Sequence, residues 1–374
     1  MIKKFLQKVF KTVSYGIFLK IHGKIEKSID CSQDKRIKVK IINKDNNLRY
    51  RVFNIINGRL YTDRIHDTAV LLDNKIIEEP SFQLRYKGYF IWDSNIENNI
   101  VIKKGTPRKL KKLNGSVLSL LTGGGGNDNY WHWLFDVLPR LSLCNKFVDL
   151  DKIDYFLLPS LHKKFQNETL DFLNIPKSKR LSSEKFRHIK AEELIVTDHP
   201  VAITGDRSKH HNDPPEWIGQ WLRDNFLKKN IISEKKNGKK IYIDRGNSTS
   251  KQSSQRYISN EDEIKKYLIK NNFILVKLHE LKFIDQVNLF YNADCVVGLH
   301  GAGFVNLVFC KHGTKVIEFR SPTSGNSIQN VSKKNNLDYN PIIVESKKIG
   351  QTNIPNQQGS YQIPINILKE KLAN

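Results

Sequence analysis

At 374 residues, 39% of them hydrophobic, the chain is longer than a single hydrophobic core usually supports, so we expect two domains. The formal net charge of +24 and a pI near 9.7 indicate anionic partners such as nucleic acid, nucleotide phosphates or an acidic membrane, unless the excess of lysine is only compositional. The four cysteines, Cys31, Cys144, Cys295 and Cys310, form no CxxC pair, which argues against a zinc site or disulfide framework and suits a reducing compartment.

The first expected element is a basic amphipathic helix within residues 1–30. Lysines interrupt its apolar residues and no small-residue cleavage site follows, so we expect the segment to be retained. No apolar run of about 18 residues, the length of a transmembrane helix, occurs in the chain. The helix either lies on an anionic membrane or packs on the protein's own surface. Helical spacing places Ile2, Phe5, Leu6, Val9, Phe10, Val13 and Ile17 on one side and Lys3, Lys4, Lys8 and Lys11 on the other.

Residues 31–232 are expected to form the N-terminal domain, of α/β type. Short β-like runs separated by polar turns occupy its first part, and strands alternate with helices from about residue 116. The polar loop 198–215 carries His199, His210 and His211, which match no metal-binding motif and are expected to be solvated. The expected strands are 38–42, 67–72, 89–92, 116–121 and 154–158, and the expected helices are 130–147 and 161–172.

Residues 233–345 are expected to form the C-terminal domain, after a basic low-complexity stretch that begins at Ser233. Its strands are separated by single helices, a pattern that predicts a parallel, Rossmann-like sheet. Ser259 and Asn260 each precede an acidic residue by three positions, which predicts a capping box. Residues 346–374 form a tail, for which a return to the N-terminal domain is one option. The expected strands are 240–244, 273–278, 294–299 and 315–319, and the helices begin at SNEDE, Phe283 and Gly303.

The stretch VVGLHGAGFVN, residues 296–306, is the most informative turn in this domain. It reads as a buried strand, a turn of small residues and the start of a helix. Ligands of open parallel sheets bind beyond the carboxyl ends of the strands. Gly301, Ala302 and Gly303 would let a diphosphate approach backbone amides at a helix N-terminus. An ordinary βα turn also needs glycine, so this motif alone does not decide the function.

Four stretches together resemble the family 61 glycosyltransferases. They are GGGGNDNYWHWLFDVLPRL from Gly123, IYIDRGNS from Ile241, SNEDEI from Ser259, and ADCVVGLHGAGFVNLVFCKHGTKVIEF from Ala293. That family includes plant β-1,2-xylosyltransferases, animal O-GlcNAc transferases that act on EGF domains or O-mannose, and bacterial polysaccharide enzymes. The resemblance covers roughly residues 115–320 and departs from the family at Trp131, where Tyr is commoner, and at Asp244, where Ser is commoner.

The resemblance implies a GT-B fold, with two Rossmann-like domains facing a cleft, and inverting transfer of a hexose or pentose from a nucleotide sugar, most often a UDP-sugar. The N-terminal domain would then take the acceptor and the C-terminal domain the donor. Arg245, after a strand, can fork onto phosphate oxygens. Glu318 would accept from the ribose hydroxyls, or else cap a helix or form a salt bridge. The remaining donor-site residues implied are His300, Gly301, Ala302, Gly303 and Asn306.

The resemblance also assigns chemistry to the helix after the glycines. His132 and Asp136 are four residues apart and share one helix face, so Asp136 can hold the imidazole as the catalytic base. Asp136 acting directly is the rival, and a purely structural role for the pair is the third reading. Arg140, one turn further, would pair with Asp136 or contact the donor phosphate. Substrate contacts are expected from Asn129, Tyr130 and Trp133, and at least one aromatic side chain of this cluster should be core.

Asp149 and Asp151 formally match the DxD motif that binds metal in other transferases, but they precede their strand, so we read a solvated turn and expect metal-independent catalysis. No cofactor is expected beyond the donor substrate. The acceptor would be a glycan or lipid-linked glycan of capsule, exopolysaccharide or lipopolysaccharide synthesis, at the cytoplasmic face of the membrane. Two alternatives remain: a basic nucleic-acid-binding protein, for which the chain shows no motif, and an inactive family member that binds nucleotide sugar or glycan.

Overall fold

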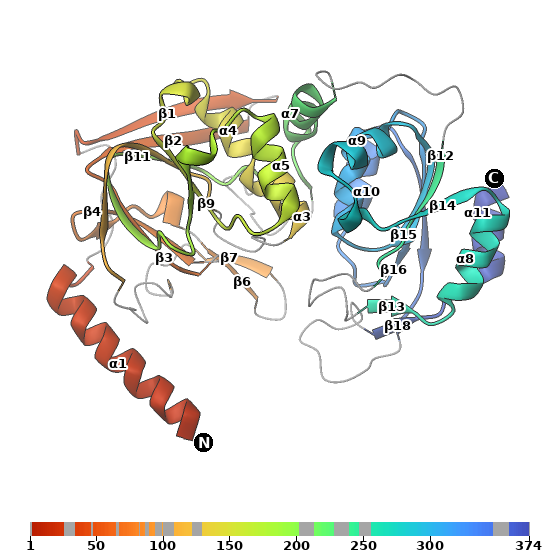
Figure 1. The fold of residues 1–374 in the computed structure, drawn as a ribbon, viewed down its shortest axis with the longest axis horizontal. Helices are drawn as coiled ribbons and strands as arrows, with labels where there is room; N and C mark the ends of the chain where they lie inside the picture. Colours follow the sequence, from red (N-terminus) through yellow and green to blue (C-terminus); the bar gives the residue numbers. More distant parts are fainter. Residues whose placement is uncertain are drawn as a thin grey trace. The chain divides into compact units, whose positions relative to one another are not determined.

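The chain separates into two compact units, residues 1–210 and 211–374 (Figure 1). The computed structural model describes residues 2–25, 34–45, 48–64, 67–81, 83–86, 90–93, 99, 108–121, 129–201, 213–227, 239–246, 256–346 and 359–373. The division falls before the basic stretch at Ser233, because helix α7 (Glu216–Phe226) packs on the second unit. Arg223 of α7 donates to the backbone carbonyls of Val308 and Cys310 at 2.8 and 2.9 Å.

A nine-stranded mixed sheet is the centre of the first unit. Its order is β10-β9-β8-β11-β3-β4-β5, and β2 joins it through β11 and pairs in turn with β1. The strands β8 to β11 are parallel, whereas β1 to β5 pair antiparallel. The strands are β1 (Ile37–Lys44), β2 (Leu48–Ile56), β3 (Arg59–Arg64), β4 (Asp67–Leu72), β5 (Lys75–Ile76), β8 (Lys111–Ser119), β9 (Tyr155–Leu158), β10 (Arg180–Ser182) and β11 (His188–Thr197).

This sheet corrects the expectation of a plain Rossmann-like N-terminal domain. In chain order its four parallel strands run 3-2-1-4, which is the first part of the Rossmann order, but the antiparallel strands extend the sheet beyond β11. A separate hairpin joins β6 (Gln83–Tyr86) to β7 (Phe90–Asp93). The helices of this unit are α1 (Ile2–His22), α3 (Tyr130–His132), α4 (Pro139–Cys144) and α5 (Lys164–Phe172).

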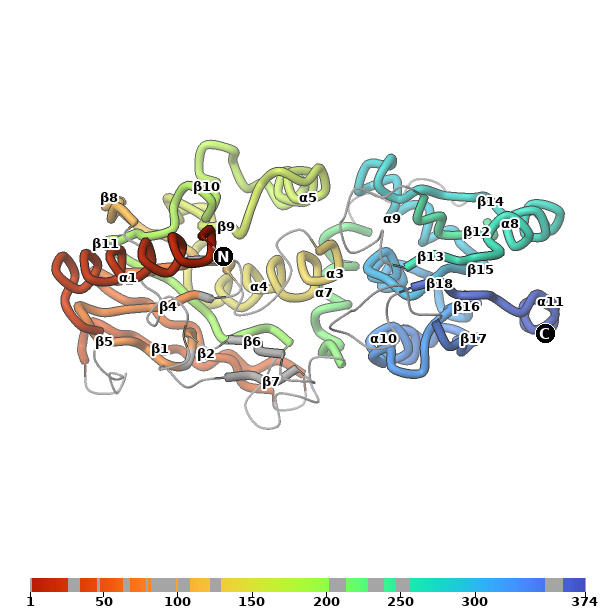
Figure 2. The backbone as a smooth tube through the Cα atoms, turned by 90° about the horizontal axis from the view of Figure 1, so that it is seen from below, coloured from red at the N-terminus to blue at the C-terminus, as the bar shows by residue number. Residues whose placement is uncertain are grey.

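The second unit is built on a five-stranded parallel sheet, which confirms the Rossmann-like prediction there. Its order is β14-β12-β15-β16-β17, or 2-1-3-4-5 in chain order, as in flavodoxin-like folds. Figures 1 and 2 show α9 and α10 on one face of the sheet and α8 and α11 on the other. The strands are β12 (Lys239–Ile243), β14 (Phe273–Val276), β15 (Ala293–Leu299), β16 (Lys315–Arg320) and β17 (Asp338–Ile343). Besides α7, the described α-helices of this unit are α8 (Glu261–Lys270), α9 (Phe283–Tyr291), α10 (Ser327–Lys334) and α11 (Ile365–Ala373).

The described part of the C-terminal tail packs on the second unit. Strand β18 (Gly359–Tyr361) pairs in parallel with β13 (Arg256–Ile258), and Leu368 of α11 is fully buried in the core of this unit. The capping box predicted at the start of α8 does not form. Asn260 precedes α8, but its side chain caps no backbone N–H of the helix. It instead donates to the Glu263 carboxylate at 3.1 Å and bonds the backbone N–H and C=O of Ile363, both at 2.9 Å.

Candidate active site

The order of the parallel sheet places one candidate site at the carboxyl ends of β12 and β15. The chain leaves β12 toward β14 on one side, while β15 lies on the other, so these two strands flank the topological switch point at which open α/β sheets bind ligands. Arg245 follows β12 and His300 follows β15. The Arg245 guanidinium donates to the His300 backbone carbonyl at 3.4 Å, which joins the two loops.

A second arginine lies in the same cluster. Burial, and then the positive charge of Arg256, lower the pKa of Arg245 to about 10. Burial likewise lowers the pKa of Arg256, which stands on β13. Both guanidinium groups remain charged near neutral pH. Two partly desolvated positive charges repel each other here. A bound anion such as a diphosphate would reduce that repulsion.

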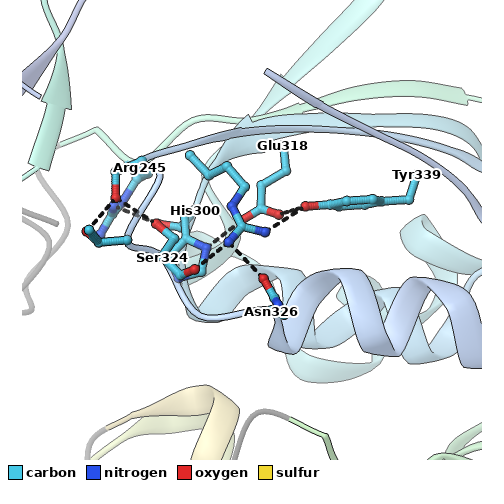
Figure 3. A network of polar contacts seen from close by, with 9 residues as sticks. Arg245, His300, Glu318, Ser324, Asn326 and Tyr339 are labelled. Atoms are coloured by element: carbon cyan, nitrogen blue, oxygen red, sulfur yellow. Dashed lines mark hydrogen bonds and ion pairs between the residues drawn. The ribbon is translucent and has the colours of Figure 1, made fainter. Parts of the chain in front are cut away.

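The His300 ring is held by a buried carboxylate (Figure 3). Its Nδ1 hydrogen-bonds Oε1 of Glu318, which is fully buried, and the Tyr339 hydroxyl donates to the other carboxylate oxygen at 2.5 Å. Burial and the Glu318 charge raise the pKa of Tyr339, which keeps this hydroxyl protonated as a donor. Glu318 therefore orients the His300 ring, and its burial does not suit the ribose contact expected from the sequence. Arg320 extends the network by donating to the Tyr339 hydroxyl at 3.3 Å.

The glycine turn between β15 and the following helix is set by close packing. That helix, Ala302–Phe309, is a 3₁₀ segment rather than an α-helix. A Cβ on Gly303 would lie 2.7 Å from Cδ1 of Leu278, so the position cannot take a side chain without displacing its neighbour. A Cβ on Gly301 would meet the Arg245 guanidinium at 3.7 Å. Asn306, expected at the donor, is instead fully buried and donates to Gln286 at 3.0 Å.

The second candidate site lies in the first unit, on the helical segment that starts at Tyr130. This segment was expected as one helix over 130–147, but it contains a π-helical turn, Trp133–Val137, between α3 and α4. Pro139 has no N–H to offer the helix, and the N–H of Leu138 bonds the carbonyl of Trp133, five residues back, at 3.1 Å. Such turns recur at functional sites because they re-aim side chains. The glycine run at 123–126 lies outside the described residues.

The π-helical turn carries the predicted histidine–carboxylate pair. Nδ1 of His132 lies 2.6 Å from Oδ2 of Asp136, and the side chains are 18% and 5% exposed. With its proton on Nδ1, the His132 ring presents Nε2 as an acceptor, as a general base requires. The buried carboxylate holds that tautomer and stabilises the imidazolium formed when the base accepts a proton.

A second histidine, which sequence reasoning missed, stands behind Asp136. His199 was expected in a solvated loop, yet its side chain is 1% exposed and its Nε2 lies 3.8 Å from the same Oδ2 of Asp136. The Val201 backbone N–H donates to Nδ1 of His199 at 3.2 Å, so the proton of the neutral ring is on Nε2 and faces the carboxylate. His210 and His211 lie outside the described residues.

Arg140 and Trp133, both expected to contact substrate, are buried and held by hydrogen bonds within the first unit. Arg140 is buried, and it donates to the Asp136 backbone carbonyl at 3.0 Å and to the Thr197 carbonyl at 3.2 Å. It thereby ties the helical segment to the end of β11 and does not pair with the Asp136 carboxylate in the way we expected. Burial lowers the pKa of Arg140 to about 10. Trp133 is fully buried, and its indole N–H donates to the hydroxyl of Thr169 at 2.9 Å.

The start of the segment is partly open. The Asn129 side chain caps α3 by accepting from the Trp131 backbone N–H at 2.9 Å. Tyr130 is half-buried against Phe165, with ring centroids 5.0 Å apart. Asp149 caps a short 3₁₀ turn through the N–H of Asp151 at 3.1 Å, which agrees with the turn predicted for the DxD sequence.

One protein-family model covers the sequence segments of both sites. The family model described as Glycosyltransferase 61 matches residues 130–317, half of the chain, and so includes the His132–Asp136 pair and the Arg245–His300 loops. The chain belongs to glycosyltransferase family 61. Membership implies glycosyltransferase activity and confirms the resemblance seen in the sequence. No curated protein matches the chain.

The family 61 match begins at Tyr130 and ends just before Glu318. Sequence reasoning found His132, Asp136, Arg245 and His300 within it, and all four lie in polar clusters at their sites. It missed Arg256, which is the first residue of the three-residue strand β13. Its signal was a lone arginine among polar residues, which no spacing rule distinguishes. Helix α1 and the tail strand β18 lie outside the match.

Proposed function

We propose that this family 61 protein is an inverting glycosyltransferase that moves a sugar from a UDP-sugar to a hydroxyl of a glycan acceptor. The observation that supports a nucleotide-diphosphate donor is the cluster of Arg245, Arg256 and His300 at the switch point of the parallel sheet. Arginine forks match phosphate geometry, and the departing diphosphate carries the charge that develops as the glycosidic bond breaks.

The His132–Asp136 pair serves as the general base in this proposal. The acceptor oxygen attacks the anomeric carbon as the bond from that carbon to the diphosphate oxygen breaks, and the bonding electrons leave with the diphosphate. Nε2 of His132 takes the acceptor's hydroxyl proton, and Asp136 stabilises the resulting imidazolium. A single displacement of this kind inverts the anomeric configuration. The first unit supplies the base and the second binds the donor, which is the division of labour of a GT-B enzyme.

The guanidinium groups supply positive charge at the diphosphate, so we propose catalysis without a metal ion. The acceptor we propose is a glycan or lipid-linked glycan of capsule, exopolysaccharide or lipopolysaccharide synthesis, and the bacterial members named by the family resemblance support that class. Activity measured with and without EDTA tests the first point. Undiminished transfer in EDTA is expected, whereas loss that is restored by added Mn²⁺ would refute it.

The experiment that tests the donor class is calorimetric titration with UDP, GDP, CMP and dTDP, at physiological salt, of the wild type and of Arg245→Ala. Selective binding of UDP that the substitution abolishes is expected. Equal, weak binding of all four with steep salt dependence would show a general polyanion surface instead. Hydrolysis or transfer from the matching UDP-sugar then separates an enzyme from an inactive binder, because a binder titrates but does not turn over.

A further inference from the structure

Helix α1 presents an apolar stripe that no described part of the protein covers. Figure 1 shows the first half of α1 extending away from the strands of its unit. Eight large apolar side chains of α1 are between 43% and 76% exposed, the richest such run on the described chain. They are Ile2, Phe5, Leu6, Val9, Phe10, Val13, Ile17 and Ile21.

The same helix is fixed to the protein by a different face. Phe18 is 1% exposed and its ring stacks on Tyr61 of β3, with centroids 5.4 Å apart. Ser14, one turn earlier, is also buried, and the His22 ring meets His188 edge-on at 4.7 Å. At 3.6 residues per turn Phe18 and His22 point away from the centre of the stripe, whereas Ser14 lies at its edge beside Ile21. The sequence left two arrangements open for this helix. Among the described residues the stripe does not pack on the protein's own surface.

The charge of α1 selects the partner. Residues 2–22 contain five lysines, Lys3, Lys4, Lys8, Lys11 and Lys20, and no acidic residue. Two copies of this chain packed stripe to stripe would each carry a net charge of +24, so a second copy is electrostatically disfavoured. An anionic lipid surface instead offers an apolar layer for the stripe and a negative surface potential that attracts the lysines on the other side of the same helix.

We propose that α1 docks the protein on an anionic lipid bilayer, with its apolar stripe at the boundary between headgroups and acyl chains. No helix in the described ranges is long and apolar enough to cross a bilayer, which makes α1 an element that lies in the surface. The anchor at Phe18 transmits this attachment to the sheet of the first unit, because the docked helix and β3 share that contact.

The test is co-sedimentation of the full-length protein with vesicles of phosphatidylcholine alone and with vesicles containing about one third phosphatidylglycerol. Phe5→Glu/Phe10→Glu removes two exposed aromatic rings of the stripe. The matched control, Ile269→Glu/Ile367→Glu, changes two exposed apolar residues on α8 and α11. Lys4→Gln/Lys8→Gln/Lys11→Gln tests the charge separately. Circular dichroism melts of every variant verify folding.

We expect the wild type and the control to sediment with anionic vesicles and not with neutral ones. The Phe variant should lose this binding, and the Lys variant should bind at least roughly tenfold more weakly. Absence of wild-type binding, equal binding to neutral vesicles, or unchanged binding of the Phe variant would overturn the proposal. A wild-type dimer that ignores vesicles and that Phe5→Glu/Phe10→Glu converts to monomers would assign the stripe to a second copy instead.

Discussion

Replacing Arg256 by alanine should weaken UDP binding, because its guanidinium lies close enough to Arg245 for the two charges to interact. A hydrogen bond between charged partners contributes about 1.5–3 kcal/mol, which corresponds to roughly 10- to 150-fold in Kd. The substitution also removes the repulsion that helps lower the pKa of Arg245, so the remaining guanidinium holds its charge more easily. That gain offsets part of the loss, and we expect an increase in Kd nearer tenfold.

The assay is calorimetric titration of UDP against Arg256→Ala, Arg256→Lys and the double variant with Arg245→Ala. Lysine keeps the charge without the fork, so its effect should lie between those of the wild type and alanine. If both arginines bind the same diphosphate, the two single effects will not add, and the cycle will show a coupling energy above about 0.5 kcal/mol. Lys333→Ala, an exposed basic residue on α10 of the same unit, controls for net charge.

Two outcomes would refute this reasoning. If Arg256→Ala binds UDP within twofold of the wild type while Arg245→Ala does not, Arg256 lies outside the donor site. If Lys333→Ala weakens binding as much as Arg256→Ala does, the effect is one of overall charge rather than of a built site.

Four further substitutions test individual contacts. Asp136→Asn should lower kcat by roughly 10²–10⁴ while UDP affinity is kept, since the substitution changes the tautomer of His132 and removes the charge that stabilises its imidazolium. Single-turnover kinetics will show this loss. His199→Gln, behind that carboxylate, should lower kcat without changing UDP affinity, measured by single-turnover kinetics and by calorimetry. Glu318→Gln should weaken UDP binding by releasing the His300 ring, measured by calorimetry. Burial lowers the pKa of His188 from 6.5 to about 4, so the neutral form is favoured in the fold. Unfolding free energy should therefore fall by up to roughly 3 kcal/mol as pH drops from about 6.5 to about 4, and urea titrations of His188→Gln should lack that fall.

The parallel sheet of the second unit was predictable because its strands are short buried runs, each followed by one helix. Expected strands at 240–244 and 294–299 appear as Lys239–Ile243 and Ala293–Leu299. The first unit was less predictable, since antiparallel strands such as β1 and β2 bury only part of their residues and show weak patterns. Their attachment to β11 is a pairing between distant segments that local sequence does not encode.

The site residues divide in the same way. His132 and Asp136 are four residues apart on one helical segment, so their contact follows from local geometry. The burial of His199 does not, because it depends on Arg140 bonding Thr197 and so bringing the end of β11 against the helical segment. A polar loop sequence around a histidine indicates exposure until such a contact is known. The role of Glu318 depended equally on Tyr339, which belongs to the next strand.

The burial of individual basic residues distinguishes kinds of anionic partner that the net charge alone could not distinguish. Arg245 and Arg256 have pKa values lowered by desolvation, and a charge held at that cost persists in a fold when a ligand offsets it. The lysines of α1 and the apolar stripe of the same helix are both exposed. Neither is desolvated until the helix meets a surface. The first arrangement suits a small anion bound at a sheet edge, and the second suits an extended anionic layer. A nucleic-acid partner would require exposed basic residues with aromatic stacking platforms, and on α1 the exposed aromatic rings lie within the apolar stripe, as membrane insertion requires.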